Sequence, residues 1–109
     1  MQINEIKQHF NNFEQCVHDA MQACQQESNV SPRLADTIRD LDREVRGAHD
    51  MVINAQEESD DLIQCIDRLE EMGDDAKRAC QSSSGLSNKM QSTILGLHKE
   101  ISTLKHQLH

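Results

Sequence analysis

Apolar residues recur along this chain at alternating intervals of three and four residues, and the phase of the pattern never slips. The stretch LADTIRDLDREV, residues 34–45, is typical, and its apolar positions are Leu34, Ile38, Leu41 and Val45. Such spacing places the side chains on one face of an α-helix. Because the same phase runs from Ile3 to Leu108, the sequence predicts long helices that share one buried seam.

The composition indicates an all-α fold and offers little to a sheet. The chain of 109 residues has one Pro and four Gly, and its only aromatic residues are Phe10 and Phe13. The core must therefore come from Ile, Leu, Val, Met and Ala. This length is enough for one domain and too short for two ordinary ones, so we expect residues 1–109 to form a single helical domain.

The first turn is marked by helix-start chemistry. Ser31 is a good N-cap residue, and Pro32 after it suits the first turn of a helix. Asn29 can take the left-handed conformation that ends a helix. We therefore predict a first helix over about residues 2–27 and a tight turn at residues 28–31.

Beyond this turn the sequence predicts two more helices, which makes about three in all. The second runs over about residues 32–72, or on to residue 81, because no strong helix breaker interrupts it. The third runs over about residues 87–108, after a segment rich in serine. The break between them falls either at Gly73 or near Gly85.

The apolar stripe is wider than a two-stranded seam, because Met51, Ile63 and Met72 lie beside it. The first and third helices together nearly match the second in length, so each can fold back along one half of it. This arrangement is an antiparallel bundle or coiled coil whose uncovered face a second copy completes, as a homodimer or homotetramer. Parallel pairing also suits the heptad pattern, and a monomeric three-helix bundle is the rival. The residues expected at the interface are Leu34, Ile38, Leu41, Val45, Met51, Val52, Leu62, Ile63, Ile66, Leu69, Met72, Ile94, Leu97, Ile101 and Leu104.

Negative charge is concentrated between residues 57 and 75, although the whole chain carries only −8. The acids expected to form a partner surface there are Glu57, Glu58, Asp60, Asp61, Asp67, Glu70, Glu71, Asp74 and Asp75. The rest of the chain is balanced in charge and has no basic stripe, which argues against nucleic-acid binding. The acidic segment favours a helical or basic protein partner.

No motif for catalysis, cofactor binding or metal binding stands out. Nucleophile elbows, phosphate-binding loops and C-x-x-C pairs do not occur, and no Glu is followed by His at the third place. The four cysteines are therefore interpreted as reduced structural thiols, typical of the cytoplasm or another reducing intracellular compartment. No apolar run is long enough to span a membrane, and the N-terminus lacks the apolar core of a signal peptide.

These features favour a non-enzymatic helical assembly protein, a scaffold, tether or adaptor subunit that acts through coiled-coil oligomerisation. The alternative is a small acidic chaperone-like or inhibitory regulator that binds one protein partner. A metal or redox helper that uses the Cys and His residues is the least favoured hypothesis.

Overall fold

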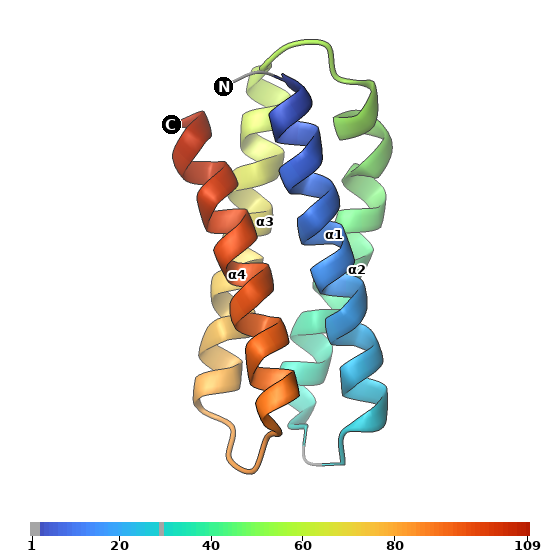
Figure 1. Ribbon diagram of the computed structural model, residues 1–109, viewed down its shortest axis with the longest axis vertical. Coiled ribbons are helices and arrows are strands. Elements are labelled where there is room, and N and C mark those ends of the chain that lie inside the picture. The colour runs from blue at the N-terminus through green and yellow to red at the C-terminus, as the bar shows by residue number, and fades with distance from the viewer. Residues whose placement is uncertain (1–2, 29) are drawn as a thin grey trace.

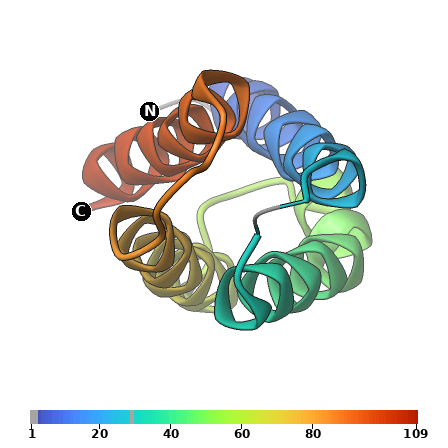
Figure 2. The same cartoon turned by 90° about the horizontal axis from the view of Figure 1, so that it is seen from below.

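The computed structural model describes residues 3–28 and 30–109, which form four α-helices. They are α1 (Ile3–Gln26), α2 (Pro32–Asn54), α3 (Asp60–Gln81) and α4 (Asn88–Leu108). Successive helices run in opposite directions, and each packs against its two neighbours in a ring, as Figures 1 and 2 show. The bundle measures 42 × 22 × 18 Å. Both chain ends and the α2–α3 loop lie at one end of it (Figure 1).

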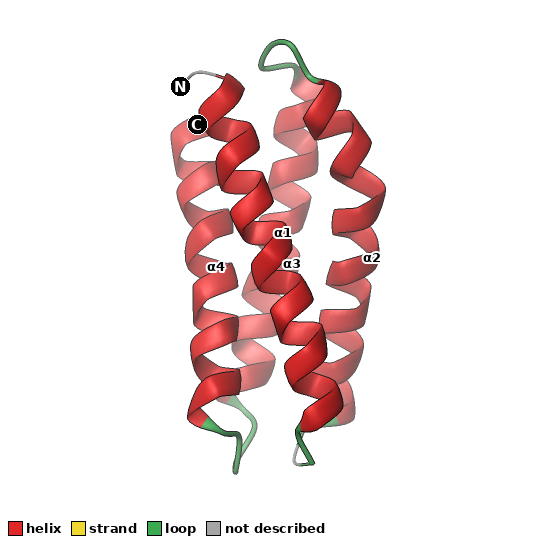
Figure 3. Ribbon diagram, turned by 45° about the vertical axis from the view of Figure 1, so that its right-hand side comes forward, coloured by secondary structure: helices red, strands yellow, loops and turns green. Residues whose placement is uncertain are grey.

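The prediction of three helices is wrong, because the expected second helix is broken at residues 55–59 into α2 and α3. Ser59 caps the helix that starts after the break: its hydroxyl oxygen accepts a hydrogen bond from the backbone N–H of Leu62, at 3.2 Å. Asp60 and Asp61 follow in the first turn of α3, where the positive end of the helix dipole favours acids. Ala55, in an extended conformation, ends α2. The loop is seen at the upper end of Figure 3.

Three helices begin with the same serine cap. Ser31, Ser59 and Ser87 each accept a hydrogen bond from the backbone N–H three residues later, and they follow one another at intervals of 28 residues. A helix and its loop therefore span four heptads. This is why the apolar phase continues unchanged through every turn, and why the phase alone could not reveal the α2–α3 break.

The core has the same register in all four helices. Phe10, Ile38, Ile66 and Ile94 are fully buried and lie at the same place in successive 28-residue units. No polar or charged residue is buried among residues 3–28 and 30–109. The face of α2 that we expected a second copy to cover is covered by α3 of the same chain. The bundle therefore closes within one chain.

Gly73 is not a helix end, so that alternative is wrong. It lies buried inside α3, where a Cβ atom would come 3.0 Å from Cγ2 of Ile101 on α4. The smallest residue thus lets the two helices approach closely. Gly85 instead lies in the α3–α4 loop with a φ of 78°, a conformation that favours glycine.

The remaining helix predictions agree with the structure within a residue or two. The helix predicted over residues 2–27 corresponds to α1, and the helix predicted over residues 87–108 corresponds to α4. The first predicted turn, at 28–31, separates α1 from α2. Residue 2 and Asn29 lie outside the described residues.

Candidate interaction surface

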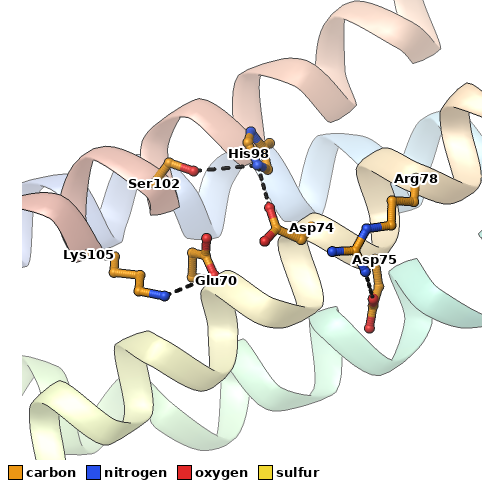
Figure 4. Close-up of polar contacts among 7 residues, drawn as sticks. All are labelled: Glu70, Asp74, Asp75, Arg78, His98, Ser102 and Lys105. Carbon is orange, nitrogen blue, oxygen red and sulfur yellow. Dashed lines mark hydrogen bonds and ion pairs between the residues drawn. The ribbon is translucent and has the colours of Figure 1, made fainter.

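The two interfaces that α3 makes with its neighbours differ in chemistry. The interface between α3 and α4 is bridged by charged and polar side chains, as the close-up in Figure 4 shows. His98 Nε2 lies 2.6 Å from Asp74 Oδ1, and Lys105 Nζ lies 3.5 Å from Glu70 Oε2. At the end of α4, His109 Nε2 lies 2.7 Å from an oxygen of Asp67. The C-terminal part of the chain therefore contacts three acids of the segment between residues 57 and 75.

Asp74, His98 and Ser102 gather the residue types of a hydrolase triad at this interface (Figure 4). The geometry is different, because Ser102 Oγ and Asp74 both face the same atom, His98 Nε2, at 3.5 and 2.6 Å. In a triad the serine and the acid bind opposite nitrogens of the imidazole. The Asp74–His98 contact joins α3 to α4, and the contact of Ser102 with His98 lies within α4, so the arrangement is not that of a triad.

The acidic segment is divided by this pairing. Asp67, Glu70 and Asp74 are half-buried and contact α4, and Asp75 pairs with Arg78 of its own helix at 3.3 Å. The acids that stay exposed apart from Asp75 are Glu57, Glu58, Asp60, Asp61 and Glu71. Only part of the predicted acidic partner surface therefore remains open at the loop end of α3.

The groove between α2 and α3 is the more apolar one. Met51 on α2 is 40% exposed and is one of two large apolar side chains that reach the surface of the described chain. Gly47, one turn earlier, has open space where a side chain would stand. Cys65 on α3 is half-buried beside it. The groove is crossed by one ion pair, between Arg68 Nη2 and Glu44 Oε1 at 3.0 Å.

Two hollows meet at Met51. The larger is an open hollow of about 570 Å³ at the α2–α3 loop, lined by Met51, Asn54, Ala55, Gln56, Glu57, Ser59, Asp61 and Leu62. The smaller is about 290 Å³, lined by Glu44, Gly47, Ala48, Met51, Cys65, Arg68 and Leu69. The two hollows have Met51 as a common lining residue, and we call them together the Met51 groove.

Most residues predicted for an oligomer interface lie in the chain's own core. The fully or almost fully buried ones are Leu34, Ile38, Leu41, Val45, Val52, Leu62, Ile66, Leu69, Ile94, Leu97, Ile101 and Leu104. Ile63 and Met72 are half-buried, and Met51 is the most exposed of the set. Among the predicted residues, Met51 alone offers a largely open apolar contact.

The cysteines have the environment of structural thiols. All four are free, Cys80 is buried and Cys16, Cys24 and Cys65 are half-buried. Burial raises the pKa of every one of these thiols above the ordinary value. A raised pKa disfavours the reactive thiolate at neutral pH. Within residues 3–28 and 30–109, no three His, Cys, Asp or Glu residues are grouped to hold a metal ion.

Sequence reasoning missed the histidine contacts that join the helices. His9 of α1 lies 3.3 Å from Glu100 of α4, and His49 of α2 lies 3.0 Å from Glu14 of α1. All four residues occupy heptad positions that flank the buried seam. These heptad positions could have predicted the contacts, because flanking positions of packed helices face each other across the interface.

Comparisons with protein-family models, with curated proteins and with solved structures found no match for this chain. Over its described residues, none of the helices is both long enough and apolar enough to cross a membrane.

Proposed function

We propose that this chain is a non-enzymatic protein-interaction module, an adaptor or binding regulator, whose partner binds at the Met51 groove. The observation that supports this most is the exposed side chain of Met51 between two hollows, with acids at one end. An apolar centre with a charged rim is the usual composition of a partner site.

Binding suits this architecture better than catalysis does. The core is filled with apolar side chains, and the hollows are open to solvent. A general acid or base needs a carboxyl or imidazole held in a desolvated pocket. His98 with Asp74 and Ser102 resembles a catalytic group most, but the contact of His98 with Asp74 joins two helices. The four free thiols support a proposed location in the cytoplasm or another reducing compartment.

Assembly of identical copies is the second candidate, and one observation favours it. Leu95 on α4 is 51% exposed, so the bundle has a second apolar contact on a different helix. The seam residues no longer support this role, because one chain buries them. A homodimer or homotetramer would have to form through the surface residues Met51 and Leu95.

Site-specific photocrosslinking in the cells of origin tests the proposal. A photoreactive amino acid at position 51 should give a crosslinked product with another protein, and the same residue at exposed position 92 on α4 should not. A product of twice the chain mass would support self-assembly instead. Equal products from both positions, or none from position 51, would contradict the proposed function.

A further inference from the structure

We infer that the occupant of the Met51 groove is a basic amphipathic α-helix of a partner protein. This inference rests on the proposed function and adds the chemistry of the partner. It follows from three properties of the groove: its exposed apolar surface, its unbalanced negative charge and the absence of an open β-edge in the described helical chain.

The exposed apolar surface sets the first requirement. It consists of Met51, with the half-buried Ala55 in the larger hollow and the half-buried Cys65 in the smaller one, whereas Leu62, Leu69 and Ala48 line the hollows from within the core. Methionine is flexible and polarisable, so Met51 can adapt to an incoming side chain. The open space over Gly47 leaves room for a backbone to come close. The partner must therefore present apolar side chains to Met51 and to the half-buried residues beside it.

Charge sets the second requirement. Glu57 and Asp61 line the loop end of the groove and form no ion pair with another described residue. Arg68, the basic residue that lines the groove, is held by Glu44. Acid without a matching base attracts a lysine or arginine from outside and repels acidic surfaces. The apolar side chains of the partner must therefore be flanked by basic ones.

The backbone of α2 and α3 sets the third requirement. Their N–H and C=O groups are used within the helices, so a partner strand would find no main-chain partner here. A helix satisfies its own backbone groups and can lie in the groove between two antiparallel helices. The expected partner is therefore a helix with apolar residues on one side and lysines or arginines on the other.

A second copy of this chain is a poorer occupant. Its exposed α4 carries Leu95 with Lys99 one turn later, which resembles the required pattern in part. However, each copy has a net charge of −8, so the acidic surfaces of two copies repel each other. The external basic helix meets the same groove without this repulsion.

A synthetic helical peptide provides the test. The probe has about 18 residues, ~27 Å as a helix, with Leu at heptad positions a and d and Lys elsewhere. A matched peptide has Glu in place of every Lys. Binding to the full chain is followed by fluorescence anisotropy at low and high salt, and by NMR of the methionine methyl groups.

The Lys peptide should bind, and the Glu peptide should not. The methyl signal of Met51 should shift, whereas that of buried Met90 should not. Met51→Ser should weaken binding about tenfold, since it removes the apolar contact without changing the charge. Gly47→Gln should also weaken it, by filling open space without straining α2. Leu95→Ser, on the other exposed apolar residue, is the matched control and should have no effect.

Four results would overturn the inference. Equal binding of the Glu peptide would show that the acids do not select the partner, and equal loss with Leu95→Ser would move the site to α4. Self-association that both Met51→Ser and Leu95→Ser abolish would make a second copy the occupant. A crosslink to another protein from position 51 without any binding of the Lys peptide would overturn this inference alone. The absence of crosslinks would contradict the proposed function itself.

Discussion

The two sides of α3 differ in how the chain uses their charges. Toward α4, its acids Asp67, Glu70 and Asp74 contact His109, Lys105 and His98, so the charges of this side are used within the chain. Toward α2, one ion pair crosses between the helices, and the acids at the loop end of the hollows, Glu57 and Asp61, stay exposed. Charge density in a sequence therefore does not show which acids stay exposed, because that depends on which charges the folded chain pairs with its own.

The largest effect is expected in the core that both interfaces of α3 enclose. Leu62→Asp or Leu41→Asp would bury a carboxyl group at a fully buried site and should cost about 3 kcal/mol or more of unfolding free energy. Circular dichroism should show loss of helicity for either variant. If either stays fully helical and as stable as the parent chain, the assignment of the core is wrong.

Two glycines at the two interfaces of α3 should respond differently to alanine. Both substitutions gain helix propensity, but Gly73→Ala should leave the bundle about 1 kcal/mol less stable than Gly47→Ala does, because its Cβ presses on the buried side chain of Ile101. Gly47→Ala meets open space and should stabilise α2 by up to about 1 kcal/mol. Urea unfolding measures both, and an equal gain for Gly73→Ala would show that α3 and α4 pack less closely than described.

The polar α3–α4 contacts should matter less than this packing. Asp74→Asn removes the charge facing His98 and should cost below about 1 kcal/mol, since both side chains are partly exposed and screened. Met51→Asp, on the open groove, should change stability by less than about 0.5 kcal/mol. A larger loss for Met51→Asp than for Asp74→Asn would reverse the roles assigned to the two interfaces of α3.

The buried thiols predict a small loss of stability at alkaline pH. Because burial raises the pKa of each cysteine in the folded chain, the folded state keeps its thiol protons after the unfolded chain has lost them. Unfolding free energy should therefore fall as pH rises above the ordinary thiol pKa. Urea titrations across this range measure the slope. A variant with all four cysteines changed to alanine should have a flatter profile, and an unchanged slope would exclude the thiols as its cause.

The sequence alone was sufficient to predict the all-helical fold class, the buried apolar seam and two of the three turns. Ser31 with Pro32, and the serines with Gly85, are local signals that the structure confirms. The break at Ser59 was missed because this residue falls in phase with the seam and no proline or glycine marks the loop. Three cap serines at equal intervals were the available signal, because they divide the chain into four helices of similar length in place of a long second one.

The candidate site was less accessible to sequence reasoning. Met51 and the exposed acids were among the predicted residues, but so were side chains that the chain uses for its own core. Which acids are used inside the chain depends on which helix lies beside α3. Heptad spacing does not determine which helix that is, because it shows which face of a helix is buried and not which element covers that face.

The central claim is that one chain closes its own core and leaves the Met51 groove for a partner. Light scattering on a size-exclusion column, across a hundredfold range of concentration in reducing buffer, tests it most directly. We expect a monomer of 12.4 kDa throughout, for the parent chain and for Met51→Asp alike. A dimer or tetramer that persists at the lowest concentration would contradict this expectation, because a second copy would then cover the seam or the exposed surface at Met51 and Leu95.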